Sequence, residues 1–478
     1  MPGSETIYLM PDWIPDAIFY QIFPDRFCNG DSSNDPPGTV PWGSLPARDN
    51  FFGGDLKGII EKLDYLQDLG VNALYLNPIF KAQTNHKYDT TDYFEVDPAF
   101  GSKAVLMDLV GELHRRNMRI ILDGVFNHCG SSFWAFEDVK ARGAASPYAQ
   151  WFCVRSYPIS SNPLSYYTCG DAAYLPKLNL SHRPVQKYIL KVATYWLEEM
   201  GIDGWRLDVP FKISMDFWQE FRSTVKAVNP QAYLVGEIWR EAGPWVQGDV
   251  FDGTTNYRLR ELILDYCATN VLDAEDFAYE LAMLRQGHGD AAPAMLNLLG
   301  SHDTPRIMTV FQGDVERLLI AVAFLITTVG TPLIYYGDEI GMVGETDPGC
   351  RRTMQWDETR WNHRVYEMYR RLIGLRRAHP ALRCGSFETL LTFNGVFAYR
   401  RVWEEDEVIV ILNPRSTVTD LLIPTASRAE VWQDAFTGRT HIAHEGKLLF
   451  DSVSGLGFSL LHVAGDIDCT RGTGTFSN

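Results

Sequence analysis

Four short segments of this sequence place carboxyl groups beside basic or imidazole side chains. They are DGVFNH (residues 123–128), GWRLD (204–208), GEIW (236–239) and GSHD (300–303). Each ends or follows an apolar run typical of a buried strand. Carboxyl groups brought close together can act as a nucleophile and a proton donor, the two groups that hydrolysis of a glycosidic bond requires.

The segment GWRLD carries two opposite charges two residues apart on an expected strand. Strand side chains alternate, so Arg206 and Asp208 point to one side and Trp205 and Leu207 to the other. The permanent charge of the guanidinium favours the ionised form of the carboxylate. Asp208 is therefore a candidate nucleophile, although a purely structural ion pair explains the spacing equally well.

Two further carboxyl groups complete the chemistry. Glu237 follows an apolar strand and precedes Trp239, where partial desolvation and nearby carboxylates favour a protonated acid. Asp303, beside His302, is a third carboxylate that would hold a sugar ring and support developing positive charge.

The elements that must position these groups form a repeating pattern. Apolar strand-like runs alternate with helical patterns, which indicates an α/β fold with a parallel sheet covered by helices. Seven runs are clear and an eighth, at 250–252, is weak; the clear ones are at 17–23, 72–78, 118–128, 204–210, 232–239, 295–303 and 332–339. Eight such units predict a (β/α)8 TIM barrel, whose functional residues lie at the carboxyl ends of the strands. One such polar residue alone is more often structural than catalytic, but four strands converging on one rim favour a site.

The remaining pattern predicts four segments. The stretch after the third strand is too long for an ordinary loop and predicts a small inserted domain. After residue 384, strands follow one another without helices, which predicts a C-terminal antiparallel β-sandwich. We therefore expect barrel at 1–128, the insert at 129–181, barrel again at 182–384, and the β-domain at 385–478.

Composition limits the partners. A net charge of −17 over 478 residues disfavours nucleic acid. The longest apolar run, 318–336, is interrupted by Gly330, Thr331 and Pro332, so we expect a buried helix followed by a strand and no membrane span.

The start lacks a basic region followed by an apolar stretch, and the eight cysteines lack CxxC pairs. We expect a cytoplasmic protein with reduced thiols and no zinc site.

The four segments, extended to LLGSHDTPR at 298–306, closely resemble the ordered signature segments of the α-amylase superfamily, glycoside hydrolase family 13. This resemblance covers nearly the whole chain. It implies a retaining double displacement with Asp208 as nucleophile, Glu237 as general acid/base and Asp303 as transition-state stabiliser. NHKYD at 85–89 resembles the loop after the family's second strand, although Tyr88 taken alone could equally be a core residue. The resemblance implies substrate binding by His86, Tyr88, His128, Arg206, His302 and Arg306, with Asp123 supporting the site.

LPKLN at 175–179 resembles a signature of the neopullulanase, cyclomaltodextrinase and maltogenic amylase group, which usually has methionine where Leu175 stands. FPDRFCNGDSSNDP at 23–36 and FFGGDL at 51–56 resemble the calcium loop of that group. Oxygen ligands at such spacings suit Ca²⁺, and the alternative is an Asx-rich turn without metal. The implied ligands are Asn29, Asp31, Asn34, Asp35, the carbonyl of Gly53 and Asp55.

Two features depart from that group. Its members normally carry an additional N-terminal β-domain that helps to form a dimer, whereas here the first expected strand begins near Ala17, so we expect a monomer without that domain. The residues after the nucleophile, Val209 to Lys212, match neither the Asn-Glu pair of the group nor the Lys-His pair of many α-amylases. The specificity for the leaving group therefore stays open.

Three functions remain on this reading. The first is hydrolysis of α-1,4-glucosidic bonds in maltooligosaccharides, cyclodextrins, starch or pullulan. The second is a glucanotransferase in which a sugar hydroxyl replaces water. The third is a non-catalytic glucan-binding protein, which predicts the loss of a carboxylate, whereas Asp208, Glu237 and Asp303 are all present.

Overall fold

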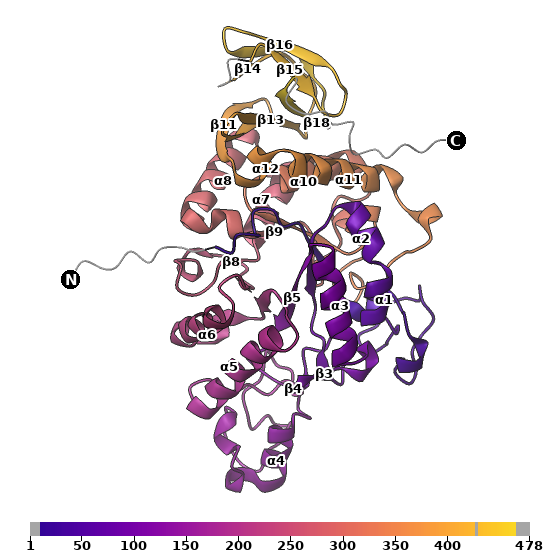
Figure 1. Ribbon diagram of the computed structural model, residues 1–478, viewed down its shortest axis with the longest axis vertical. Helices are drawn as coiled ribbons and strands as arrows, with labels where there is room; N and C mark the ends of the chain where they lie inside the picture. Colours follow the sequence, from indigo (N-terminus) through magenta and orange to yellow (C-terminus); the bar gives the residue numbers. More distant parts are fainter. Residues whose placement is uncertain (1–9, 426–428, 465–478) are drawn as a thin grey trace, which may run out of the picture. The chain divides into compact units, whose positions relative to one another are not determined.

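The computed structural model describes residues 10–425 and 429–464 (Figure 1). Cys469 therefore lies outside the described residues. The chain divides into two compact units, which are described separately. The first contains the residues up to 258 together with 287–309 and 331–362, and the second contains 259–286, 310–330 and the residues from 363.

The first unit contains an eight-stranded parallel sheet with the order β8-β7-β6-β5-β2-β1-β10-β9. A parallel bridge between Thr255 and Leu296 links the two ends of this order, so the sheet closes and the predicted barrel is confirmed. Its strands are β1 (Phe19–Ile22), β2 (Ala73–Leu76), β5 (Arg119–Gly124), β6 (Gly204–Leu207), β7 (Tyr233–Gly236), β8 (Gly253–Thr254), β9 (Leu296–Leu298) and β10 (Thr331–Tyr335).

These segments form strands because both faces of the sheet are buried. Every residue of β1, β2, β6, β7 and β9 is buried, which explains their continuous apolar composition. Phe19, Tyr75, Ile121, Tyr233 and Leu298 pack together in one hydrophobic cluster. The weak strand expected at 250–252 begins three residues later, as β8, because only Gly253 and Thr254 pair with β7.

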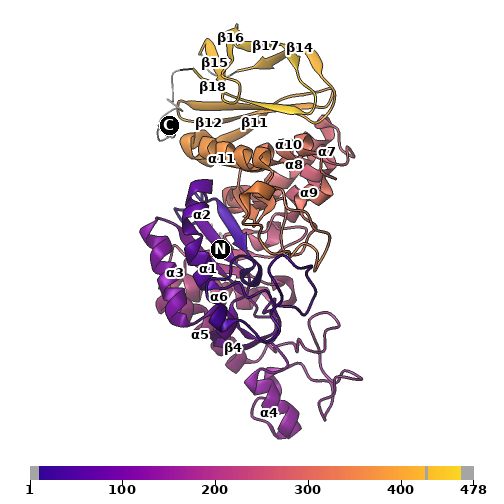
Figure 2. The ribbon, with the colours of Figure 1, turned by 90° about the vertical axis from the view of Figure 1, so that its right-hand side faces the viewer.

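The helices of the first unit surround the strands (Figures 1 and 2). Asp55 accepts a hydrogen bond from the backbone of Gly58 and caps α1, and Gly70 ends α2 with a left-handed φ of 96°. The helices are α1 (Leu56–Glu61), α2 (Leu63–Leu69), α3 (Lys103–Arg115), α4 (Trp134–Arg142), α5 (Arg183–Glu198), α6 (Met215–Val228) and α9 (Ile307–Val310). Helix α7 (Tyr257–Cys267) begins at the end of this unit and continues in the second.

Two insertions extend the loops on the strand ends. Strands β3 (Phe80–Ala82) and β4 (Thr90–Val96) pair antiparallel between β2 and α3. The longer insertion separates β5 from α5 and contains α4 and isolated bridges such as His128 with Lys177. Helix α4 projects away from the barrel strands in both views (Figures 1 and 2). The inserted domain is present, while its exact boundaries stay a prediction.

The second unit combines most of α7 and four further helices with an antiparallel sheet. The four further helices are α8 (Ala274–His288), α10 (Val315–Thr327), α11 (His363–Ala378) and α12 (Pro380–Cys384). The strands are β11 (Ser386–Phe393), β12 (Val396–Trp403), β13 (Asp406–Asn413), β14 (Val418–Pro424), β15 (Val431–Asp434), β16 (Thr440–His444), β17 (Lys447–Val453) and β18 (Gly457–Val463). Residues from β12, β13, β14, β15, β17 and β18 share one core.

The apolar run at 318–336 forms a buried helix followed by a strand, as expected, because α10 ends at Thr327 and β10 begins at Thr331. Among the residues that the structure describes, no helix has the length and hydropathy needed to cross a membrane. Cys153 and Cys169 are both free thiols.

Candidate active site

The carboxyl ends of four barrel strands deliver the expected polar side chains to one pocket. Asp208 directly follows β6, and Glu237 directly follows β7. Asp303 lies in the turn after β9. All three line a pocket of about 310 Å³, and its other lining residues include His86, Tyr88, His128 and His302.

Arg206 lies at the centre of this carboxyl cluster. Its Nη1 donates to Asp123 at 2.9 Å and to Asp208 at 3.0 Å, and its Nη2 lies 3.1 Å from Oε1 of Glu237. The guanidinium is 1% exposed. One positive charge thus faces three carboxyl groups, which favours the retention of a proton within the cluster.

The pKa of Asp208 is well above its ordinary range. Burial is the main cause, and the neighbouring Glu237 adds to it, while Arg206 acts in the opposite direction. Arg206 favours the ionised form of Asp208, as the sequence predicts, but burial has the larger effect on the pKa of this carboxyl group. Arg206 also shares its charge with Asp123 and Glu237.

Glu237 is held by donors from three positions. The backbone N–H of Val209 donates to Oε2 at 3.0 Å, and the indole N–H of Trp239 donates to Oε1 at 3.0 Å. Arg206 supplies the third contact. Trp239 is itself fixed by stacking on Tyr257, with ring centroids 3.8 Å apart. The orientation of this carboxyl group is therefore set by the protein before any ligand binds.

Asp123 lies beneath the pocket and supports it. Its Oδ2 accepts hydrogen bonds from the hydroxyls of Tyr75 at 2.7 Å and Tyr88 at 2.9 Å, in addition to the contact with Arg206. Asp123 is 1% exposed and does not line the pocket. Its position is that of a support for Arg206 and Tyr88, as the family resemblance implies.

His302 is a neutral imidazole whose tautomer follows from its contacts. Gln21 donates to Nδ1 at 2.8 Å, so the ring proton is on Nε2, which lies 2.6 Å from the hydroxyl of Tyr88 and 3.1 Å from Asp303. Burial, with Arg351 and Arg206 nearby, lowers the pKa of His302 well below its ordinary value. The rings of Tyr88 and His302 are nearly parallel, with centroids 5.7 Å apart.

The other two histidines of the pocket are also neutral near pH 7. Burial lowers the pKa of His86 to about 3 and that of His128 to about 4. Nε2 of His128 is buried and has no hydrogen-bond partner in the described part of the chain. Because an unsatisfied buried nitrogen is costly, this atom is suited to a hydrogen bond with a ligand hydroxyl.

Arg306 is expected to bind substrate, but the structure places it apart from the pocket. It neither lines the pocket nor contacts the supporting residues Asp123 and Arg206. Its guanidinium is fully buried between the rings of Tyr335 and Tyr336 and donates to Asp338 at 3.0 Å. A side chain enclosed in this way fixes the turns after β9 and β10. It does not reach a ligand in the pocket.

Sequence reasoning missed several pocket residues, above all Asp347 and Arg351. Arg351 contacts Asp303 at 3.2 Å and Asp347 at 3.1 Å. Asp347 and Arg351 follow β10, the eighth barrel strand, whose carboxyl-end loop must face the same rim as the loops of the other strands. Their position after a barrel strand was the sequence signal that could have identified them. Cys169, Tyr174, Leu175 and Val209 also line the pocket.

The expected calcium-loop residues lie together in the first unit. Nδ2 of Asn29 donates to Asp35 at 2.8 Å, and a Cβ atom at Gly53 would lie 2.3 Å from the same carboxylate oxygen. Asp55 accepts hydrogen bonds from the backbone of Gly30 and from Asn34. Asp31 differs, because its carboxylate accepts from Ser33 and faces Lys57.

These residues offer a mixed set of oxygen donors. Oδ1 of Asn34 is buried and has no hydrogen-bond partner among the described residues. Each carboxylate oxygen of Asp55, in contrast, already accepts two hydrogen bonds, Oδ1 from Gly30 and Gly58 and Oδ2 from Asp31 and Asn34. No group of three or more His, Cys, Asp or Glu in the described part of the chain could hold a metal ion. The donors here are amide, carbonyl and carboxylate oxygens, which fit Ca²⁺ better than a transition metal.

Comparison with known proteins gives a consistent picture. Residues 21–385 match the family described as "Alpha amylase, catalytic domain". A cyclomaltodextrinase of Thermoanaerobacter pseudethanolicus is 46% identical over 87% of this chain and 73% of its own length. Neopullulanase 2 of Thermoactinomyces vulgaris is 44% identical over 92% of this chain and 77% of its own length.

A solved structure of similar length also matches. The cyclic alpha-maltosyl-(1-->6)-maltose hydrolase of Arthrobacter globiformis, in complex with that sugar, is 42% identical with a TM-score of 0.87. The alignment covers 95% of this chain and 99% of that one.

Proposed function

Since this chain belongs to the α-amylase family of glycoside hydrolases and is an α-glucan hydrolase, we propose that it cleaves α-1,4-glucosidic bonds by double displacement with retention of configuration. The observation that carries this proposal is the contact of Asp208 and Glu237 with one guanidinium. A shared partner holds the two carboxyl groups close together, and a short separation suits a retaining enzyme.

In the first step, a carboxylate oxygen of Asp208 attacks the anomeric carbon and the bond to the glycosidic oxygen breaks. The proton of Glu237 passes to that oxygen, so the leaving sugar departs as an alcohol. The proton that the cluster retains through burial of Asp208 is then the one that Glu237 donates once a sugar is bound.

In the second step, Glu237 takes a proton from water while the water oxygen attacks the anomeric carbon. The bond to Asp208 breaks, and its carboxylate is restored. Asp303, held by Arg351 and His302, is placed to stabilise the positive charge that develops on the ring in both steps.

The neutral histidines are proposed to bind the sugar at the point of cleavage. Nε2 of His302 lies in the pocket wall against the hydroxyl of Tyr88 and Asp303, and His128 presents a buried ring nitrogen that has no partner among the described residues. Tyr88, which lines the pocket, offers a ring face for stacking against the sugar. These contacts are expected to select neutral glucose units, since none requires a charged ligand.

We also propose that the loop around residues 29–55 binds one structural Ca²⁺. Asn29, Asp31, Asn34, Asp35, the carbonyl of Gly53 and Asp55 would hold it. The buried oxygen of Asn34 without a partner supports this assignment. When bound, the ion would tie the loop to α1, which Asp55 caps.

The proposed location is the cytoplasm. A relative from Bacillus subtilis that carries the name intracellular maltogenic amylase is 43% identical over 85% of this chain. The seven cysteines in the described part of the chain are free thiols, which agrees with a reducing compartment. We propose a monomer, as expected from the sequence.

The test of mechanism is the configuration of the first product. Proton NMR during cleavage of maltoheptaose should show the α-anomer of the new reducing end before mutarotation, and initial formation of the β-anomer would disprove retention. Chromatography after incubation with β-cyclodextrin, soluble starch, pullulan and cyclic maltosyl-maltose then ranks the substrates. The Asp208→Asn chain is the blank.

A further inference from the structure

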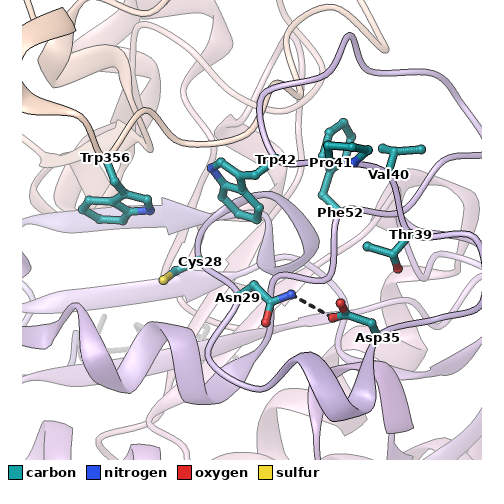
Figure 3. Close-up of a pocket in the computed structure, with 9 residues that line it drawn as sticks. All are labelled: Cys28, Asn29, Asp35, Thr39, Val40, Pro41, Trp42, Phe52 and Trp356. Atoms are coloured by element: carbon teal, nitrogen blue, oxygen red, sulfur yellow. Dashed lines mark hydrogen bonds between the residues drawn. The ribbon is translucent and has the colours of Figure 1, made fainter.

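A second pocket lies in the first unit, and the proposed mechanism does not use it. Its volume is about 530 Å³, within the usual range for small-ligand sites. It shares no lining residue with the catalytic pocket in the described part of the chain. Its lining residues are Cys28, Asn29, Asp35, Thr39, Val40, Pro41, Trp42, Phe52 and Trp356 (Figure 3).

Two tryptophans give this pocket flat apolar surfaces. The indole N–H of Trp42 donates to the carbonyl of Met354 at 3.0 Å, and that of Trp356 donates to the carbonyl of Phe27 at 2.6 Å. Both rings are therefore held in place without needing a hydrogen bond from a ligand. Trp42 is nevertheless 37% exposed, which is unusual for a large ring whose orientation is fixed.

The polar residues lie across from the rings. Figure 3 shows the aromatic rings on one side of the pocket and Asn29 and Asp35 on the other, joined by their 2.8 Å hydrogen bond. The oxygens of these two side chains are proposed Ca²⁺ ligands, but the amide of Asn29 keeps a second hydrogen beyond this bond. That hydrogen can be donated to a hydroxyl group of a ligand.

Charge does not select the ligand of this pocket. Its lining contains one carboxylate, a proposed Ca²⁺ ligand, and no basic residue among those described, while the ammonium of Lys62, outside the lining, lies 4.3 Å from the centroid of the Trp356 ring. Flat apolar faces opposite hydroxyl-binding groups match a neutral polyhydroxylated ring. Sugars combine these two properties.

The two pockets lie close enough for one polymer chain to reach both. Arg351 lines the catalytic pocket and Trp356 lines the second. Trp356 is five positions after Arg351 in the chain, so their Cα atoms are at most about 17 Å apart. A long glucan held at the second pocket would keep other glucose units near the carboxyl cluster.

We propose that the pocket between Trp42, Trp356 and Asn29 is a non-catalytic binding site for an α-glucan chain. It retains long substrates while another part of the same chain is cleaved. The proposal rests on the proposed function for the identity of the sugar. It therefore concerns polymers such as starch, and short oligosaccharides gain nothing from it.

The first test measures binding without turnover. The Asp208→Asn chain, with calcium present, is run on native gels with increasing soluble starch. Adding Trp42→Ala should weaken the apparent affinity about fivefold to tenfold, as expected for the loss of one aromatic platform. Trp403→Ala is the matched control, because Trp403 is a similarly exposed tryptophan, at 44%, that lines neither pocket.

The second test uses the active chain. Trp42→Ala should lower kcat/KM for soluble starch several-fold and leave kcat/KM for maltotriose within about twofold, whereas Trp403→Ala should change neither. Trp356 also packs against Phe27 and Tyr65, so Trp356→Ala is interpreted only with a native circular dichroism spectrum. Trp42→Leu serves as the second variant at the exposed ring.

Each outcome decides the proposal. Unchanged starch affinity in folded Trp42→Ala and Trp42→Leu chains overturns it, and so does an Asp208→Asn parent that starch does not retard. Equal losses on starch and maltotriose would place Trp42 in the catalytic pocket and also overturn it. If the active chain fails to cleave any glucan, the gel experiment still reports on this pocket, so failure of the proposed function is distinguishable.

Discussion

Carboxyl groups occur in two contrasting regions of the first unit, the strand ends of the barrel and the loop at residues 29–55. At the strand ends, burial raises the pKa of Asp208 and of Asp123. In the loop, the hydroxyl and backbone N–H of Ser33 lower the pKa of the exposed Asp31. The same side chain is thus driven toward the protonated form in one region and toward the ionised form in the other.

The difference shows what each region can do. A buried cluster that retains a proton can supply it to a leaving group, which is the basis of acid catalysis. The loop at residues 29–55 instead gathers amide, carbonyl and carboxylate oxygens, which suit a cation, and the lowered pKa of Asp31 favours its ionised form. Acid catalysis and cation binding thus call on carboxyl groups in different surroundings.

The largest expected effect follows from removing the buried nucleophile. Asp208→Asn should lower turnover of maltoheptaose by at least about 10⁴-fold, since the covalent step loses its attacking oxygen. Its melting temperature should not fall, because the variant removes a carboxyl group from a crowded cluster. Asp64→Asn is the control, since Asp64 is 85% exposed and only pairs with Arg116 on the surface. Turnover above a hundredth of the parent value would disprove the assignment.

The next effect concerns the pH dependence of stability. The pKa of His128 is about 4 in the native state against 6.5 for the free side chain. Between these values the unfolded chain binds a proton that the native chain does not, so stability falls as pH falls from about 6.5 to 4.

The contribution of His128 to the pH dependence of stability is isolated by comparing urea unfolding of the parent and of His128→Gln from pH 6 to pH 4.5. Asp208 acts in the opposite direction, because its pKa is raised in the native state, but it is common to both chains. The parent should lose up to about 1.4 kcal/mol per pH unit more than the variant. Parallel curves would show that His128 takes up its proton in the folded protein.

In the loop, the expected effect is smaller and depends on the metal. Chelation by EDTA should lower the melting temperature by roughly 5 °C, because an ion bound only to the native state stabilises it. Asn34→Ala, which removes the buried oxygen without a partner, should abolish most of this shift. An identical melting temperature after prolonged warm incubation with EDTA would leave the Asx-rich turn without metal as the better interpretation.

The smallest effect tests strain beside the nucleophile. Val209 has φ 36° and ψ 50°, a left-handed conformation that costs a β-branched residue about 1–2 kcal/mol. Val209→Gly should therefore leave the free energy of unfolding unchanged or raise it by up to about 1 kcal/mol. Val271→Gly, at an exposed valine without a positive φ, should instead lower it. Equal losses in the two variants would show that the backbone at Val209 is not strained.

The barrel could be predicted from the sequence to a large extent. Seven strands were found because each is buried on both faces and therefore reads as an uninterrupted apolar run. The remaining strand, β8, was misplaced because Gly253 and Thr254 form only two residues of strand and carry no apolar signal. In the β-domain, the runs GVFAYRRVW, EVIVILNP, EVWQDAF and LGFSLLHV predict β12, β13, β15 and β18. Strands β11, β14, β16 and β17 were missed, because exposed residues interrupt the buried ones along each of them.

The candidate site likewise contains residues that the sequence predicts and residues that it does not. Asp208, Glu237 and Asp303 were found because they stand at strand ends. Arg306 was expected to bind substrate, and its burial beside Asp338 depends on the turn after β10, which local pattern does not specify. Asp347 and Arg351 were missed for the related reason that their loop has no strand signal of its own.

The sequence by itself determined which side chains lie at strand ends and which pairs share a face, because apolar runs and the alternation of strand side chains are local properties of the chain. Only the tertiary structure decided that Arg206 contacts three carboxyl groups, that His302 is neutral with its proton on Nε2, and that Trp42 and Trp356 line one pocket. These properties arise where distant segments meet after the barrel closes. Burial and charge at such contacts are set by neighbours that the local sequence does not contain.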